Sequence, residues 1–138
     1  LDLPVMIVGD GREYGRLKSI ASSPNIKFTG FIHDPAELKK IYNGAKAFLF
    51  PQIEDFGLVA AEALSCGTPV IGYDAAGAKE MVVPGRNGLL FGEQSAEALR
   101  GSVEQFEKME FDVSEVSSSA EKFSRAEFEK KLRNIVGS

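Results

Sequence analysis

Glu54 and Glu62 are two carboxylates with seven residues between them, and they flank the start of an apolar helical pattern. Glu54 lies in the loop Pro51–Leu58, and the helix is expected to begin near Gly57 or Leu58. The free N–H groups and positive dipole end of such a helix suit a phosphate or a sugar hydroxyl. Gly57 would keep that helix end open to a ligand. The spacing therefore indicates a binding site for a polar ligand.

Glu62 is the one charged residue in the pattern Leu58–Leu64. A carboxylate buried in an apolar helix is costly unless it is paired. The diol of a ribose would be a fitting partner, because two hydroxyls can donate to one carboxylate. The alternative is that the face carrying Leu58, Glu62 and Ser65 is simply exposed to solvent, and the residues alone do not decide between the two.

Other loops offer weaker signals. Gly9, Asp10 and Gly11 follow an apolar run, but with Gly15 the spacing is one residue too long for the dinucleotide fingerprint. They form either a ligand-approach loop or a tight strand-to-helix turn. Asp74–Ala78 has the same two interpretations, with the turn favoured. A single histidine (His33) and a single cysteine (Cys66) are expected to be structural.

The strands and helices around these loops determine where the loops lie. Along the chain, apolar runs alternate with helical patterns. Continuous apolar runs are typical of parallel strands buried on both faces. Their alternation with helices implies right-handed crossovers and an α/β fold with a doubly wound parallel sheet. In such sheets ligands bind beyond the carboxyl ends of the strands. The expected strands are Pro4–Val8, Ile26–Thr29, Ala47–Phe50, Pro69–Tyr73 and Gly88–Phe91, and the expected helices cover residues 12–22, 35–44, 57–66, 77–83, 95–108 and 124–136.

Composition limits the classes of protein. The chain has 138 residues, which suggests one domain, and 43% of them are apolar. The net charge of -4 argues against a nucleic-acid partner. No Ser/His/Asp set, P-loop or pair of cysteines at metal-site spacing is present. The chain begins with Leu1 and has no signal-peptide pattern, so it reads as a piece of a longer protein.

The segment from Glu54 to Ile71 resembles the E-x7-E signature of retaining, group 1 (family 4-like) glycosyltransferases with the GT-B fold. The flanks agree, since Val8–Gly11 is similar to the family's V-G-D-G loop and Phe28–Gly30 to its F-x-G strand end. Ala76–Glu80 followed by Pro84–Phe91 resembles its G-G-x-x-E stretch. The E-D-F-G variant is most similar to mannosyltransferase-like members. The resemblance covers about residues 3–100, with Phe123–Val136 similar to the family's last helix.

The resemblance implies that residues 1–138 form the Rossmann-like carboxyl-terminal domain, which binds a nucleotide-diphospho sugar as donor substrate. No cofactor and no metal are expected. The implied roles are catalysis and donor-sugar contact for Glu54, sugar and diphosphate contacts for the backbone of Phe56, Gly57 and Leu58, ribose binding for Glu62, and base-side positions for Gly9, Asp10, Gly11, Phe31, Ile32 and His33. The alternative function is a non-catalytic α/β module that binds a nucleotide or a sugar.

Two departures from the family bear on activity. The family's basic pair that grips the diphosphate follows an upstream strand without a counterpart here, and the amino-terminal domain that binds most of the acceptor is absent. We therefore expect the fragment alone to be inactive and the intact enzyme to transfer a hexosyl group to a glycan or lipid-linked acceptor in polysaccharide biosynthesis. The expected location is cytoplasmic, with peripheral membrane association of the intact enzyme left open.

The missing strand also bears on the sheet. It is central in the family's strand order, and its loss leaves the flavodoxin-like order 2-1-3-4-5. The expected five-stranded sheet then pairs Pro4–Val8 directly with Ala47–Phe50. The alternative is a gap filled by a partner segment, because an unfilled gap would expose two strand edges.

Overall fold

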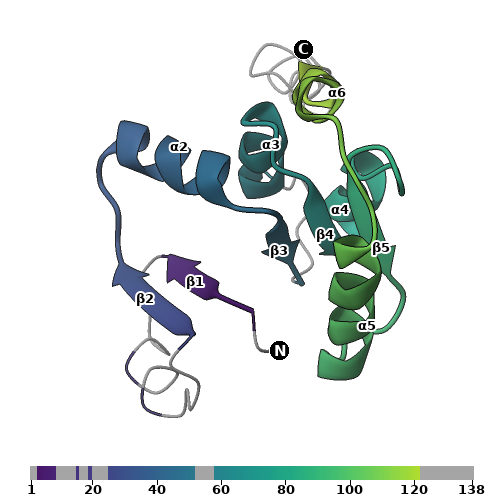
Figure 1. Cartoon of the computed structure of the whole chain (residues 1–138), viewed down its shortest axis with the longest axis horizontal. Coiled ribbons are helices and arrows are strands. Elements are labelled where there is room, and N and C mark those ends of the chain that lie inside the picture. The colour runs from purple at the N-terminus through teal and green to yellow at the C-terminus, as the bar shows by residue number, and fades with distance from the viewer. Residues whose placement is uncertain (1–2, 9–14, 16–18, 20–24, 52–57, 122–138) are drawn as a thin grey trace, which may run out of the picture. The chain divides into compact units, whose positions relative to one another are not determined.

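Parallel strands connected through helices make up the computed structural model, which describes residues 3–8, 15, 19, 25–51 and 58–121 (Figure 1). The strands are β1 (Val5–Val8), β2 (Ile26–Gly30), β3 (Phe48–Phe50), β4 (Val70–Tyr73) and β5 (Gly88–Phe91). The helices are α2 (Pro35–Gly44), α3 (Leu58–Ser65), α4 (Ala76–Met81), α5 (Ala96–Glu107) and α6 (Val113–Ser119). The α/β class is confirmed. The helices expected at 12–22 and 124–136 lie outside the described residues, apart from Gly15 and Ser19, which are helical.

The chain divides into two compact units, Leu1–Ile41 and Tyr42–Ser138. In the first unit β1 pairs in parallel with β2, and the register shifts between Ile7 and Val8. Thr29 Oγ1 donates to the carbonyls of Ile7 and Gly30, at 3.4 and 2.9 Å. These bonds lie at the carboxyl end of the ladder, where Gly30 adopts a φ of 73° that favours glycine.

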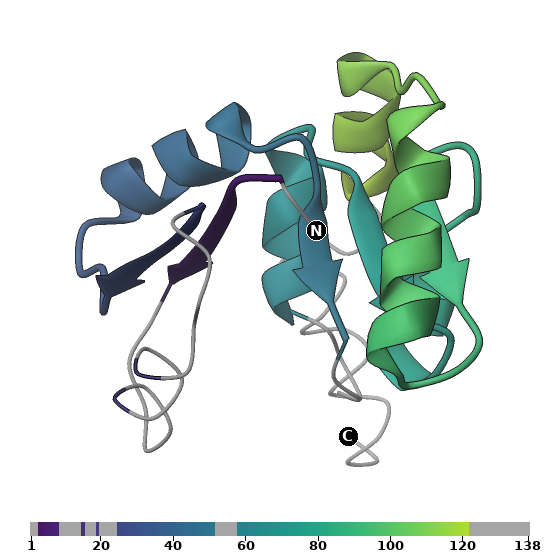
Figure 2. The ribbon, with the colours of Figure 1, turned by 60° about the horizontal axis from the view of Figure 1, so that its bottom comes forward.

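In the second unit β3, β4 and β5 form a parallel ladder in that order. Helix α3 packs against β3 and β4, α4 against β4, and α5 against β5 and β4. Figure 2 shows α5 on one face of this ladder and α3 on the other. The core is the interior of this unit, where Phe50, Leu64, Val70 and Val116 are fully buried. Strand β4 is central, which explains its continuous apolar pattern.

The expected order 2-1-3-4-5 is correct for the neighbours β2-β1 and β3-β4-β5, but the single five-stranded sheet is not observed. The hydrogen-bonded ladders that the structure describes are β1-β2 in the first unit and β3-β4-β5 in the second. Each of these ladders joins strands that follow one another in the chain.

Helix ends follow the polar residues around them. Ser95 caps α5, because its side chain accepts a hydrogen bond from the Ala98 N–H, and the helix starts where the sequence predicts one over 95–108. Asp112 caps α6 in the same way through the Glu115 N–H, so the polar stretch after α5 is a short helix. Helix α3 ends in a Schellman turn, in which Gly67, at φ 80°, donates to the Leu64 carbonyl and Thr68 to that of Ala63.

Candidate functional site

The predicted donor segment leaves the sheet at the carboxyl end of β3. Residues 52–57 lie outside the described part, and with them Glu54, Phe56 and Gly57. The structure describes both ends of this segment. Strand β3 ends at the fully buried Phe50, and α3 begins at Leu58, where the sequence predicts it. The segment thus spans the strand end and the amino terminus of α3, the region where doubly wound sheets bind ligands.

Glu62 is exposed on α3, whereas Ala60, Ala63 and Leu64 are fully buried against the sheet. The Glu62–Ser65 side of the helix is therefore its solvent face, and Ser65 Oγ donates to the Glu62 carbonyl at 2.7 Å. The carboxylate carries no cost of burial and is accessible to a ligand. Exposure fits both interpretations of Glu62, the ribose contact and the solvated face.

Tyr42 lies buried near Glu62, in the same unit. The pKa of Tyr42 is raised to about 12, mainly by burial and further by the nearby Glu62 and Cys66. The Tyr42 ring packs edge-on against Phe48, with centroids 5.8 Å apart. Its carbonyl accepts a 2.6 Å hydrogen bond from Thr68 Oγ1, which is buried. This bond joins the end of α2 to the α3–β4 turn.

Packing between α4 and β4 accounts for the small residues in the loop Asp74–Ala78. Gly77 and Ala78 are buried, and a Cβ on Gly72 would lie 3.0 Å from that of Ala78. Small residues are therefore needed where α4 meets β4, which supports the turn interpretation of this segment. Ala76, at φ 46°, is the one non-glycine residue with positive φ among those described. Asp74 is exposed at the strand end.

The residues after β2, which the family resemblance predicts to lie on the base side, are mostly exposed. Phe31 is 64% exposed, and its ring meets that of His33 edge-on, with centroids 4.6 Å apart. Ile32 between them is half-buried, and Asp34 caps α2 by accepting from the Ala36 N–H at 2.9 Å. An exposed aromatic ring at a strand's carboxyl end is suited to stack on a planar base. The other residues predicted for the base side, Gly9, Asp10 and Gly11, lie outside the described residues.

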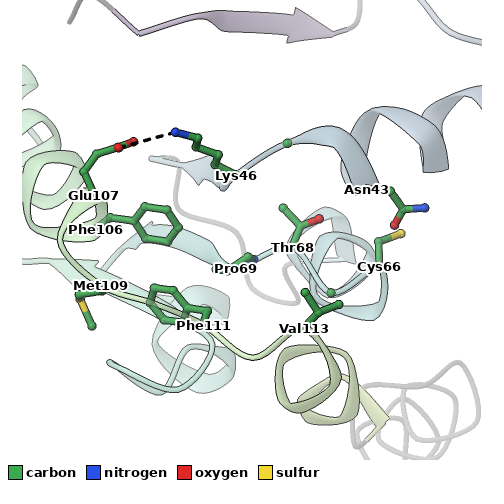
Figure 3. Close-up of a pocket in the computed structure, with 12 residues that line it drawn as sticks. Asn43, Lys46, Cys66, Thr68, Pro69, Phe106, Glu107, Met109, Phe111 and Val113 are labelled. Atoms are coloured by element: carbon green, nitrogen blue, oxygen red, sulfur yellow. Dashed lines mark ion pairs between the residues drawn. The ribbon is translucent and has the colours of Figure 1, made fainter.

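A groove of about 590 Å³ lies in the second unit at the opposite, amino-terminal edge of β3 and β4. Figure 3 shows the stacked rings of Phe106 and Phe111 in it, with the ion pair of Lys46 and Glu107 at 3.7 Å. Cys66 lines this groove and is half-buried, which fits its expected packing role. Among the predicted site residues whose side chains the structure describes, Glu62, Phe31, Ile32 and His33, none lines this groove.

The sequence did not single out two residues that the structure makes prominent. Asn87 lies in the turn before β5 and is buried with hydrogen bonds from both ends of its side chain. Gln94 follows β5 and reaches the carbonyl of Pro51. The sequence offered one signal for Asn87, which is its place in the turn Pro84–Gly88. Gln94 has no local signal, because its partner is 43 positions away.

Within the described ranges, no group of three or more His, Cys, Asp or Glu side chains could hold a metal ion. None of the helices described there has the length and hydropathy that crossing a membrane requires.

Residues 1–129 match the family described as glycosyl transferases group 1. The chain belongs to this family. The match extends from β1 through α6 and includes the segment that carries Glu54 and Glu62. The expected family resemblance is therefore confirmed.

Two curated relatives of this glycosyltransferase chain illustrate the similarity. It is 38% identical over 90 residues to a GDP-mannose-dependent alpha-mannosyltransferase of Mycolicibacterium smegmatis, covering 64% of this chain and 23% of the relative. It is 33% identical over 93 residues to a D-inositol 3-phosphate glycosyltransferase of Gordonia bronchialis, covering 67% of this chain and 19% of that protein. The glycosyltransferase chain thus spans about a fifth to a quarter of the length of these relatives.

Solved structures share the fold of this glycosyltransferase chain. The apo form of the lipopolysaccharide outer core galactosyltransferase WaaB superposes with a TM-score of 0.78 at 21% identity, over 95% of this chain and 39% of WaaB. Anabaena HepE, solved in complex with UDP-glucose, superposes with a TM-score of 0.68 at 23% identity, over 96% of this chain and 40% of HepE. At these identities the likeness shows the Rossmann-like fold of GT-B glycosyltransferases.

Proposed function

We propose that this chain is the donor-binding domain of a retaining glycosyltransferase, which moves a hexosyl group from a nucleotide-diphospho sugar to a glycan or lipid-linked acceptor. The observation that carries the proposal is the start of α3 at Leu58, directly after the segment with Glu54 and one turn before the exposed Glu62. In this proposal Glu54 and Glu62 act around one helix end at the edge of the sheet where doubly wound folds bind ligands.

Each group has a chemical task in this proposal. Glu54 contacts the hydroxyls of the donor sugar and takes part in catalysis. The backbone N–H groups at Phe56, Gly57 and Leu58 face the sugar and diphosphate, where the helix dipole favours negative charge. Glu62 accepts hydrogen bonds from the ribose hydroxyls. The loop Phe31–His33 lies on the base side, where the exposed Phe31 ring offers an apolar face.

The donor type and the wider context are inferred from the relatives. The name of the mycolicibacterial relative specifies GDP-mannose, so a GDP-sugar is the first donor to test. UDP-glucose is the second, because HepE was solved with it. We propose that basic groups elsewhere in the intact enzyme and the α3 end neutralise the diphosphate without a metal. Acceptor binding would involve mainly a domain outside this sequence, and a cytoplasmic location stays a prediction.

Glu62→Gln in the intact enzyme tests the nucleotide part of the proposal. The change keeps the size of the side chain and removes the charge that accepts the ribose hydroxyls. A charge-assisted hydrogen bond contributes about 1.5–3 kcal/mol, so nucleoside-diphosphate affinity should fall by roughly 10- to 150-fold. Titration calorimetry with GDP and UDP measures it. Glu104→Gln, at an exposed position on α5, is the matched control. Unchanged affinity in the Glu62 variant would show that this carboxylate is only a solvated surface group.

Glu54→Ala tests the transfer part. It should lower turnover while leaving the affinity for free nucleoside diphosphate nearly intact, because Glu54 is assigned to the sugar. Loss of nucleotide affinity with normal turnover would mean that the two glutamates have exchanged roles. An intact protein that binds the nucleotide without transferring sugar to any acceptor or to water would instead support the non-catalytic binding module.

A further inference from the structure

The ladder between β1 and β2 contains an extra residue near its carboxyl end. Ile7 pairs with Phe28. The next residue, Val8, pairs with Gly30, so Thr29 is the extra residue of a β-bulge. Side chains alternate between the two faces of a strand, and one inserted residue therefore reverses the faces that the following side chains take. The bulge at Thr29 thus decides how the chain leaves β2.

The hydroxyl group of Thr29 holds this bulge in place. Oγ1 donates to the Gly30 carbonyl at 2.9 Å, and the Ile7 carbonyl is a second acceptor at 3.4 Å. Both bonds are partly buried, so water replaces them less readily than it replaces bonds on the open surface. The Gly30 carbonyl belongs to the planar peptide group that also contains the Phe31 N–H. The Thr29 hydroxyl therefore fixes the plane from which Phe31 extends.

The loop that follows carries an exposed aromatic ring between two anchored ends. Gly30, at φ 73°, turns the chain out of the strand, in a conformation that favours glycine. Phe31 comes directly after it, is 64% exposed, and meets the ring of His33 edge-on. Asp34 holds the other end of the loop by capping α2. Supports of this kind around a binding side chain fix its direction.

We propose that Thr29 is a positioning residue for nucleotide binding, which fixes the peptide group before Phe31 and through it the direction of the Phe31 ring toward the base. This inference rests on the proposed function, in which the loop Phe31–His33 lies on the base side. Thr29 itself does not touch the nucleotide. Its hydroxyl acts on the carbonyl of Gly30, directly before the ring that does.

The test compares Thr29→Val with Thr29→Ser in the intact enzyme, with GDP and UDP as probes in titration calorimetry. Valine keeps the shape of threonine without the hydroxyl, whereas serine keeps the hydroxyl. Loss of one neutral hydrogen bond corresponds to about a three- to ten-fold weaker affinity in Thr29→Val, and Thr29→Ser should stay within about two-fold of the wild type. Ser118→Ala removes an exposed hydroxyl on α6 and is the matched control, with both affinities unchanged.

A double-mutant cycle with Phe31→Ala separates this role from a general effect on the fold. Phe31→Ala should itself weaken the binding of both nucleotides, because it removes the ring offered to the base. Thr29→Val should then cause no further loss in the Phe31→Ala background, since no ring is left to position. A merely structural role would instead lower the melting temperature and reduce affinity by the same factor in both backgrounds.

The assignment is overturned by wild-type affinity in Thr29→Val or in Phe31→Ala, by an equal loss in Thr29→Ser, or by losses that add in the double mutant. If valine prevents folding, Thr29→Ala gives the same comparison, because alanine also lacks the hydroxyl. A wild-type enzyme that binds neither GDP nor UDP would overturn the proposed function itself. That result differs from an enzyme that binds them and is indifferent to Thr29.

Discussion

Replacing Asn87 by alanine should destabilise the fold more than the short turn around it suggests. Its Oδ1 accepts from the Val83 N–H at 2.7 Å, and its Nδ2 donates to the Met81 carbonyl at 2.9 Å and to Ser119 Oγ at 3.0 Å. The residue is 1% exposed, so water does not replace these partners in the native packing. One side chain therefore joins the end of α4, the turn before β5 and α6.

The expected cost follows from these three bonds. At about 0.5–1.5 kcal/mol for each, Asn87→Ala should lower the free energy of unfolding by about 1.5–4.5 kcal/mol. Urea unfolding followed by circular dichroism measures this as a lower midpoint with an unchanged slope. Asn43→Ala, at an exposed position near the end of α2, should change the free energy by less than about 0.5 kcal/mol.

A double-mutant cycle with Ser119→Ala isolates one of the three bonds. Ser119 Oγ also donates to the Val116 carbonyl at 2.6 Å, so this single change has its own cost. The coupling between Asn87 and Ser119 should nevertheless be about 0.5–1.5 kcal/mol. A total loss below about 1 kcal/mol in Asn87→Ala would refute the reasoning, because three buried bonds would then contribute less than one ordinary bond.

Two further predictions concern backbone conformation and pH. Gly67→Ala should destabilise the chain more than Gly85→Ala in thermal unfolding. The two glycines have similar positive φ angles, 80° and 86°. A Cβ at Gly67, however, would lie 2.5 Å from Val113 Cγ1, whereas a Cβ at Gly85 would have nothing within 4 Å. Equal losses would mean that Val113 moves away freely. Because the pKa of Tyr42 is raised from 10.0 to about 12, its contribution to stability is fully present below pH 10 and is lost as pH rises toward 12. Tyr42→Phe should flatten this part of a stability–pH curve, and an unchanged curve would contradict the assignment.

The elements that flank the candidate site could be predicted because their signals are local. An apolar run ending at Phe50 and a helical pattern starting near Leu58 define the predicted donor segment between them. Neither pattern depends on residues far away in the sequence. Ser95 likewise marks the start of α5, since a cap interacts with residues only three positions away. The position of Glu62 within an otherwise apolar helix also follows from its immediate neighbours.

The tertiary structure decided the interactions between distant residues. Asn87 reaches Ser119 over 32 positions and Gln94 reaches Pro51 over 43, and neither partner can be inferred from spacing. Local preferences choose helices, strands and turns because they act within a few residues. Strand edges and side-chain partners are chosen by the packing of whole elements, which depends on many residues at once.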